Sequence, residues 1–489
     1  MKTSKKKKGD VVYKIDLEKA YDHVNWNFLR GCLTQFGFPP ITIDLIMHCV
    51  TESSLSLIWN GHRLPVFSPT RGLRQGDPLS PYLFVMCMER LSHAILQAVD
   101  NNEWKPISVS KDGPRLSHLF FADDVLLFSK ASVSQANVIE RILTNFAMSS
   151  GLRVNVRKSR AFFSANTRRR KIESIVSITG IQSTNSLGKY LGFPMIHERL
   201  CKGDFDFLID KVQQRLASWK NKLLNKAGRL ALVQSVLTSI PTYYMQSIWL
   251  PTSICDYIDR TSRNFLWRGT NDRGVHLVGW EKITQPRKQG GLGIRTARDS
   301  NTAMLGKLVW DIHSNNDKLW VNLITQKYVG NKSVLDVPKK AGSVVWNSIM
   351  KARKVLRNGY SYRLGNGSSS FWYDHWSEHG RLSDHVWYVE IHDTHLTVAD
   401  LTHQGPWELS RLYTHLPDNI LDSISKISLC LNENIPDGYT WKGNLDGIYS
   451  AKAGYSWVKS TTSNDSSMDV SSWKWLWKLP APEKFKFFC

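Results

Sequence analysis

The chain has 489 residues, of which 42% are apolar and 22% charged, and its mean hydropathy is −0.30. This globular composition and length predict two to four domains, and they exclude a small disulfide-stapled scaffold. No uninterrupted apolar stretch of about 20 residues is present, which argues against a membrane-spanning chain. The excess of 64 Lys and Arg over 42 Asp and Glu gives a net charge of +22, which favours a polyanionic partner such as nucleic acid.

The seven cysteines are odd in number and scattered, and no C-x-x-C pair suggests a structural metal or redox centre. The N-terminus lacks the apolar core of a signal peptide. We therefore expect reduced thiols and an intracellular location. The basic run at residues 5–8 could act as a nuclear signal, although a solvated loop is the simpler interpretation.

The first predicted element is a half-buried strand over residues 11–17, because apolar and polar residues alternate along it. Lys14 and Asp16 share its polar face. Two helices follow, one from Asn25 to the stop signal at Gly37 and Pro39, and one after Pro40. Residues 54–67 predict a β-hairpin around the Asn60-Gly61 turn.

A loop rich in Gly and Pro at residues 69–77 leads into a helix from about Leu79. Two apolar runs then flank Asp123-Asp124 and predict a second hairpin. A helix over residues 134–150 should end at Gly151, and residues 152–164 predict a strand pair. Strands that pair by hairpins between helices favour an α+β sheet with helices on one face and the other face open.

Beyond residue 200, apolar residues at helical spacing over 204–241 predict helices. The Gly-rich stretch 289–301 predicts a turn before a helix, since it lacks the Lys-Ser/Thr of a phosphate-binding loop. Residues 363–376 predict another hairpin, and 460–472 a flexible linker. The helical region also carries basic residues, which suit either a solvated face or a nucleic-acid contact: Lys211, Arg215, Lys220, Lys222, Lys226 and Arg229.

Two adjacent aspartates between apolar runs are often just a turn, because Asp tolerates turn geometry. A metal site is the alternative, and it needs a third carboxylate. Asp16 can supply it if its strand lies beside the hairpin that carries Asp123 and Asp124. Carboxylates about 4 Å apart repel one another by roughly 4 kcal/mol at an effective dielectric constant near 20, and a divalent cation relieves this repulsion. Oxygen ligands of this kind suit Mg²⁺.

Five segments of the chain together indicate a family. They are "DLEKAYD" (16–22), "RQGDPLSPYLF" (74–84), "FADD" (121–124), "GLRVNVRKS" (151–159) and "KYLGFP" (189–194). In this order they resemble the palm motifs of reverse transcriptases, and the likeness is strongest to plant LINE-type non-LTR retrotransposons. The resemblance continues through the helices after residue 200 to the C-terminal "WKWLWKLPAPEKFKFF", which resembles a zinc-binding segment.

The resemblance implies an RNA-directed DNA polymerase that uses two Mg²⁺ ions, or Mn²⁺, with an RNA template, a DNA primer and deoxynucleoside triphosphates. Asp16, Asp123, Asp124 and the Leu17 carbonyl resemble the metal ligands. Tyr21 matches an aromatic gate against the ribose 2′-hydroxyl, or is an ordinary core tyrosine. The remaining implied roles are nucleotide contacts by Arg74, Gln75 and Gly76, proton donation to pyrophosphate by Lys158, and a primer grip at 190–192.

Arg74 could equally be a solvated arginine, and Lys158 a member of a surface salt bridge. The implied layout is a polymerase palm at residues 1–198, a helical thumb at 199–270, and a mixed Trp-rich C-terminal region. That region divides into a mixed connector at 271–380 and an incomplete zinc-binding-type segment at 381–489.

Only 15 residues precede Asp16, whereas the family carries fingers upstream, so we expect Met1 to be internal to a longer reading frame. The absence of fingers should impair activity. Two other interpretations stay open. One is a non-catalytic nucleic-acid-binding remnant of such an enzyme, and the more remote one is another palm-type phosphoryl-transfer enzyme such as a nucleotide cyclase.

Overall fold

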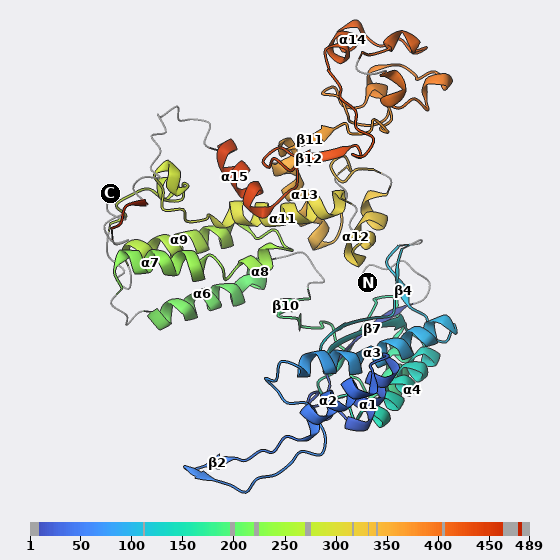
Figure 1. Cartoon of the computed structure of the whole chain (residues 1–489), viewed down its shortest axis with the longest axis vertical. Coiled ribbons are helices and arrows are strands. Elements are labelled where there is room, and N and C mark those ends of the chain that lie inside the picture. Colours follow the sequence, from blue (N-terminus) through green and yellow to red (C-terminus); the bar gives the residue numbers. More distant parts are fainter. Residues whose placement is uncertain are drawn as a thin grey trace. The chain divides into compact units, whose positions relative to one another are not determined.

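The computed structural model divides into two compact units, residues 1–199 and 200–489 (Figure 1). Three stretches lie wholly or mostly outside the described residues: the basic run at 5–8, the predicted linker at 460–472, and the C-terminal "WKWLWKLPAPEKFKFF" motif. The structure describes residues 9–110, 113–195, 201–219, 224–268, 275–314, 317–330, 332–338, 341–402, 406–462 and 478–481.

Unit 1 is built on a four-stranded antiparallel sheet in the order β6-β7-β1-β8. The first strand of the chain therefore lies inside the sheet, between β7 and β8. This arrangement confirms a mixed fold of helices and antiparallel sheet. The strands are β1 (Asp10–Ile15), β6 (His118–Phe121), β7 (Asp124–Lys130) and β8 (Arg160–Phe163).

Helices cover one face of this sheet (Figure 1). Tyr13 and Ile15 of β1 point into that core, where Leu29 and Leu33 are fully buried. Each such side chain contributes about 1.5–3 kcal/mol through its removal from water. The helices of unit 1 are α1 (Trp26–Gln35), α2 (Pro40–Thr51), α3 (Ser80–Asp100), α4 (Val133–Ser150) and α5 (Arg169–Thr179).

Local signals set the ends of these helices. The Asn25 side chain accepts hydrogen bonds from the backbone N–H groups of Asn27 and Phe28, and so caps α1. Gly151 ends α4 in the left-handed conformation with a φ of 79°. The predicted start and stop of these two helices are thus confirmed.

The second face of the sheet is only partly open, which corrects the expectation of an open face. Val12, Leu126 and Phe162 form a small apolar cluster there with Leu187, and Tyr190 packs against it. The covering chain, which includes β9 (Lys189–Tyr190) and β10 (Phe193–Pro194), comes from beyond residue 180. This long-range contact leaves the polar end of the face, around Asp16, for the site described below.

The predicted strand pair within residues 152–164 is wrong. Only β8 forms a strand, and it pairs with β1 rather than with its own neighbour. Asn155 turns the chain instead: its backbone carbonyl accepts bonds from the N–H of Lys158 and the N–H of Ser159. Val154 makes a single bridge to Leu17.

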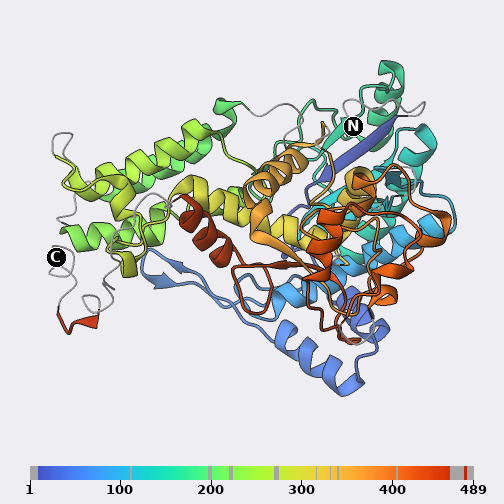
Figure 2. The same ribbon diagram turned by 90° about the horizontal axis from the view of Figure 1, so that it is seen from above.

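The hairpin at residues 54–67 is confirmed, with β2 (Ile58–Trp59) and β3 (His62–Arg63) joined by Asn60-Gly61. Both turn residues have a positive φ, as a tight hairpin turn demands. Figures 1 and 2 show it as an arm projecting from the rest of unit 1. A second short pair in this unit is β4 (Ile107–Ser108) with β5 (Arg115–Leu116).

Unit 2 begins with helices that share an apolar core around Val233 and Leu266. The predicted helical character of this region is confirmed, and Lys220 and Lys222 lie outside the described residues. These helices are α6 (Asp206–Trp219), α7 (Lys226–Leu232), α8 (Thr242–Met245), α9 (Thr252–Arg268) and α10 (Trp280–Ile283).

The rest of unit 2 has two further cores. One is aromatic and includes Trp346, Trp441 and Tyr449. The other includes Trp372 and Ile420. The Gly-rich stretch before α11 forms the predicted turn, with Gly290 and Gly293 at positive φ. The elements are α11 (Ala297–His313), α12 (Leu319–Ile324), α13 (Val344–Leu356), β11 (Tyr360–Arg363), α14 (Asp418–Ser425), β12 (Gly438–Trp441) and α15 (Ala451–Thr462).

The hairpin predicted at residues 363–376 does not form, because β11 pairs with the distant β12. Asp437 explains the difference. Its carboxylate accepts hydrogen bonds from the backbone N–H groups of Gly365 (2.5 Å), Gly367 (2.9 Å) and Ser369 (2.7 Å). These bonds hold the segment after β11 as a loop.

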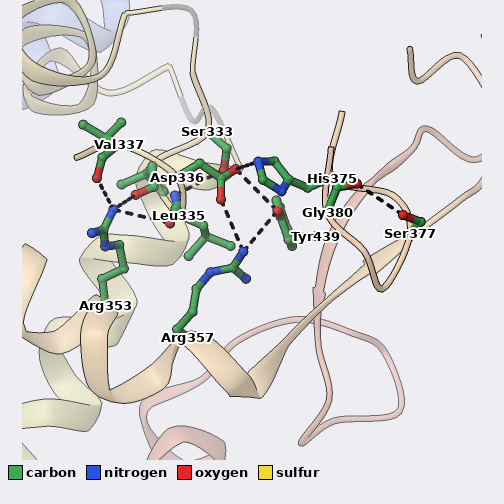
Figure 3. A network of polar contacts seen from close by, with 11 residues as sticks. Ser333, Leu335, Asp336, Val337, Arg353, Arg357, His375, Ser377, Gly380 and Tyr439 are labelled. Carbon is green, nitrogen blue, oxygen red and sulfur yellow. Dashed lines mark hydrogen bonds and ion pairs between the residues drawn. The ribbon is translucent and has the colours of Figure 1, made fainter. Parts of the chain in front are cut away.

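A polar network fixes residues 333–337 against α13 (Figure 3). The Arg353 guanidinium donates to the carbonyls of Val334 (3.0 Å), Leu335 (3.4 Å) and Val337 (2.6 Å). One turn further along, Arg357 lies 3.3 Å from the Asp336 carboxylate. One cation on α13 and one at its C-terminal cap thus anchor the loop. Within the described residues no helix has the length and apolar character needed to cross a membrane.

Candidate active site

Strand register brings Asp16 and Asp124 to the same place on the sheet. Ile15 pairs with Val125, so Asp16, the next residue, falls opposite Asp124. Opposite residues of an antiparallel pair point to the same face. Ile15 and Val125 point into the helix-covered core, and the two carboxyl groups therefore point to the other face.

Asp123 lies in the two-residue turn between β6 and β7, since Phe121 pairs with Asp124. Ala122, the other turn residue, has a φ of 50°. A tight hairpin turn requires this left-handed conformation, which costs a non-glycine residue about 1–2 kcal/mol. The turn fixes where Asp123 leaves the sheet.

The three carboxyl groups interact electrostatically. Partial burial raises the pKa of Asp124, and the negative charges of Asp123 and Asp16 raise it further, while the Lys14 ammonium opposes the shift. Like charges near one another favour the neutral form of one of them. The structure thus brings together the three aspartates that the sequence indicated.

The Asp16 backbone is held from a fourth segment. Its N–H donates to Ser159 Oγ (3.1 Å), and its carbonyl accepts from the N–H of Asn155 (2.8 Å). Ser159 is fully buried. Sequence reasoning did not assign it a role, although its place beside Lys158 in the "VRKS" segment was a signal. Leu17 is buried and bridges Val154, so the ligand role of its carbonyl stays a prediction.

Lys14 is a second residue whose role the sequence analysis missed. Its Nζ donates to the Lys189 carbonyl at 2.5 Å and so joins β1 to β9. The alternation along β1 already placed Lys14 beside Asp16, but no pattern indicated a partner 175 residues away. Lys14 supplies the positive charge that acts on Asp124.

Tyr21 stacks on Phe84 of α3, with ring centroids 4.7 Å apart and planes 16° from parallel. Its backbone carbonyl accepts from the N–H of Leu73 (2.7 Å). Burial raises the pKa of the Tyr21 hydroxyl, and the charge of Asp123 adds to the shift. Tyr21 therefore lies near the hairpin turn of Asp123, and Phe84 supports one face of its ring.

The loop at residues 71–77 packs closely on the chain after β1. Gly72 has a φ of 91°, and a Cβ built there would lie 2.6 Å from the Asp22 carbonyl oxygen. Trp26 Nε1 donates to the Gly72 carbonyl at 2.8 Å. Gly72 is thus required both by conformation and by close approach, and it positions the predicted nucleotide loop.

The predicted loop residues themselves make the following contacts. Gln75 Nε2 donates to Asp22 Oδ1 (3.3 Å). Gly76 has a φ of 89°, with open space where a Cβ would stand. The Arg74 guanidinium donates to the Cys49 carbonyl (2.9 Å) and lies 3.1 Å from the Asp77 carboxylate. Arg74 is thus engaged within the loop, and its contact with phosphate stays a prediction.

Lys158 is exposed, and its backbone N–H donates to the Asn155 side chain (3.2 Å). Among the described residues the structure gives its ammonium no ion pair, so the salt-bridge alternative has no support there. It lies within the turn at residues 155–159 that holds Asp16. Its role toward a leaving group stays a prediction.

The hairpin of β9 and β10 turns through Leu191 and Gly192, both at positive φ (50° and 75°). Burial raises the pKa of Tyr190, and the charge of Asp124 adds to it. Tyr190 therefore lies within electrostatic reach of the carboxyl cluster. The primer-grip role of residues 190–192 stays a prediction.

The carboxyl groups offer the hard oxygen donors that Mg²⁺ and Mn²⁺ take. The raised pKa of Asp124 reflects an unfavourable energy of its charged form, which a bound cation would reduce. In the parts of the chain that the structure describes, however, no three His, Cys, Asp or Glu side chains are gathered closely enough to form a ready-made metal cage. Mg²⁺ usually binds through one or two carboxylates plus substrate phosphates and water, so the acids fit this mode.

Comparison with known proteins gives a family for the first unit. Residues 1–195 match the family model described as "Reverse transcriptase (RNA-dependent DNA polymerase)". An Arabidopsis thaliana protein named as a candidate ribonuclease H protein is 32% identical over 303 residues, covering 60% of this chain and 49% of that protein.

A second relative is the retrovirus-related Pol polyprotein from a type-1 retrotransposable element R2 of Popillia japonica. It is 22% identical over 316 residues, which are 63% of this chain and 50% of the polyprotein. The chain thus spans about half the length of these two curated relatives. A telomerase structure from Candida albicans aligns with 67% of this chain and 52% of its own, at 11% identity and a TM-score of 0.29, which is too low to support an argument.

The match over residues 1–195 covers every candidate residue described above, from Asp16 to Tyr190. The chain also has homologues named as retrotransposon Pol polyproteins. Residues 1–195 are thus similar to the reverse transcriptase family.

Proposed function

We propose that this chain is part of an RNA-directed DNA polymerase of a non-LTR retrotransposon, of the plant LINE type. The observation that supports the proposal is that Asp16 lies opposite Asp124 and that the charges of Asp16 and Asp123 both act on Asp124, within the reverse transcriptase match. RNA template, DNA primer and deoxynucleoside triphosphates are the proposed partners.

Asp16, Asp123 and Asp124, with the Leu17 carbonyl, would hold two Mg²⁺ ions, with Mn²⁺ as a substitute. Divalent cations there would lower the pKa of the primer 3′-hydroxyl and neutralise charge on the departing pyrophosphate. Asp16 is suited to a fixed ligand position because its backbone is bonded on both sides, to Ser159 and Asn155.

The remaining residues would position the nucleotide and primer. Tyr21, with its ring fixed against Phe84, would exclude a ribose 2′-hydroxyl. Gln75 and Gly76 would line the nucleotide pocket, where a missing Cβ allows close backbone approach. Lys158 would donate a proton to pyrophosphate. Arg74 would have to exchange its internal contacts for a phosphate.

The proposed layout assigns the palm to residues 1–198 and a thumb to 199–270. Basic residues on α6, α7 and the chain between them, such as Lys211 and Arg229, would follow the duplex backbone without reading sequence. Residues 271–380 would connect to a zinc-binding-type segment at 381–489. No described group of His and Cys supports that last assignment so far.

The alternative is a non-catalytic nucleic-acid-binding remnant, which the net charge of +22 favours. Primer extension on an RNA template with Mg²⁺ separates the two. We expect DNA synthesis that Asp123→Asn abolishes while nucleic-acid affinity persists. Binding without any synthesis by the unsubstituted chain would select the alternative.

A further inference from the structure

Unit 2 carries a group of exposed aromatic side chains that the proposed polymerase chemistry does not use. Trp387 is fully exposed, Tyr413 is 73% exposed and Tyr388 69%. All three aromatic side chains line one surface cavity of about 490 Å³. Large aromatic side chains are seldom left in water together unless the surface binds something.

The cavity is held open by the buried carboxylate of Asp393. This carboxylate accepts hydrogen bonds from the backbone N–H groups of Tyr413 (3.2 Å) and Thr414 (2.6 Å). The Thr414 hydroxyl in turn accepts from the N–H of Glu390 (2.9 Å). The two segments that carry the aromatic residues are therefore tied to each other, and the His392 ring packs on Tyr413 with centroids 5.3 Å apart.

The charge of the cavity has the opposite sign to that of the chain. Glu390 and Asp418 are part of its lining, and neither Lys nor Arg is. The whole chain, by contrast, carries a net charge of +22. The lining also includes the imidazoles of His385 and His415. A phosphate backbone entering the cavity would meet two carboxylates and no Lys or Arg side chain. Nucleic acid is therefore a poor fit here, although it suits the chain as a whole.

Aromatic rings beside carboxylates attract cations. An ammonium or guanidinium group over a Trp or Tyr face gains from the ring quadrupole, and a nearby carboxylate adds direct attraction. We propose that the cavity bounded by Trp387, Tyr413, Glu390 and Asp418 is a docking site for a Lys- and Arg-rich peptide segment of a partner protein. Such a site would tether the polymerase to a basic protein without competing for its nucleic acid.

The test is the affinity of the full chain for a fluorescein-labelled octalysine and an octaarginine peptide, measured by fluorescence anisotropy at low salt. We expect Trp387→Ala and Tyr413→Ala each to weaken binding about five- to tenfold. Glu390→Gln should weaken it about threefold and reduce the salt dependence. An uncharged octaglutamine peptide should not bind.

Matched controls lie elsewhere on the surface. Trp59→Ala removes another exposed tryptophan, from the hairpin arm, and Glu433→Gln removes an exposed carboxylate outside the cavity. Neither should change peptide affinity. Thermal unfolding should show an unchanged Tm for all five variants, because the substituted side chains are at the surface.

Three results would overturn the proposal. The first is no measurable binding of either cationic peptide. The second is binding that the control variants weaken as much as Trp387→Ala does. The third is that the cavity variants bind a labelled oligo(dT) or oligo(U) strand more weakly but bind the peptides as tightly as the unsubstituted chain does. That result would identify a nucleic-acid surface instead.

Discussion

The Lys14 ammonium donates to the backbone carbonyl of Lys189, 175 residues further along the chain. This bond joins the central strand of the sheet to the hairpin that carries Tyr190. It also holds a positive charge beside Asp124. The Lys14 side chain therefore helps to hold the hairpin over the candidate site, beside the apolar contacts of Leu187 and Tyr190.

Lys14→Met should loosen that hairpin. A hydrogen bond from a charged donor contributes about 1.5 kcal/mol, which corresponds to roughly tenfold in amide exchange protection. Hydrogen exchange should therefore become faster at residues 188–195, where Met195 N–H bonds to the Gly188 carbonyl. Lys171→Met, at an exposed site on α5, is the control. Unchanged exchange in Lys14→Met would contradict the link.

Gly72→Ala and Gly76→Ala form a matched pair in one loop. Both glycines have a φ near 90°, but only at Gly72 would a Cβ strike a backbone carbonyl, that of Asp22. We expect Gly76→Ala to cost about 1 kcal/mol of unfolding free energy from conformation alone. Gly72→Ala should cost about 3 kcal/mol, because overpacking adds to the same strain. Urea denaturation measures both, and equal costs would be inconsistent with the close approach.

Asp124→Asn should stabilise unit 1 slightly without divalent metal. The raised pKa of Asp124 means that its charged form is penalised in the folded chain, so the penalty is present at neutral pH and disappears as the group protonates at low pH. Because the group is largely solvent-exposed, the gain should be at most about 1 kcal/mol.

Mg²⁺ should make the unsubstituted chain more stable than Asp124→Asn. A cation that binds only the folded chain stabilises it in proportion to its occupancy. We therefore expect Mg²⁺ to raise the Tm of the unsubstituted chain more than that of Asp124→Asn, and EDTA to abolish the difference. Glu173→Gln, on α5, is the control, and an equal Mg²⁺ response in all three chains would argue against the metal site.

Asp259→Asn should stabilise unit 2 in a pH-dependent way. Burial raises the pKa of Asp259 to about 6, although the Ala297 N–H donates to it. Its folded pKa exceeds its unfolded value, so stability falls as pH rises from about 4 through 6. The amide should therefore gain up to about 3 kcal/mol at pH 7.5 and almost nothing at pH 4. Chemical denaturation at both pH values checks this, and a pH-independent gain would refute the assignment.

Arg353→Met should destabilise unit 2 by about 2–3 kcal/mol, because it leaves three loop carbonyls without their shared donor (Figure 3). Lys354→Met, at the exposed neighbouring position, should stay within about 0.5 kcal/mol of the unsubstituted chain. Differential scanning calorimetry compares the two. Similar Tm values would mean that the loop is held by its apolar contacts instead.

Local patterns allowed much of unit 1 to be predicted. The alternation along β1 placed Asp16 on a polar face, and two adjacent Asp between apolar runs indicated the hairpin turn, because each signal depends only on neighbouring residues. The same alternation was misleading for residues 152–164, where Asn155 forms a turn instead. A local pattern could not reveal that β8 pairs with β1.

The contacts that the sequence could not give are those between distant residues. Lys14 with Lys189, and Asp437 with the loop after Gly365, join segments that no periodicity relates. The prediction of an open sheet face was wrong for the same reason, because Leu187 covers part of that face from a distant segment of the chain. Residue types can suggest which side chains are reactive or bind ligands. The residues that those side chains contact depend on the tertiary fold.

The central place of β1 in the order β6-β7-β1-β8 has a consequence for biosynthesis. Residues 10–15 are translated well before their neighbours at 124–130 and 160–163. At about 5–20 residues per second, this strand waits roughly 7–30 s for both partners. During that interval it is exposed to aggregation and to chaperones, so slower translation upstream of residue 163 should lower the yield of folded protein.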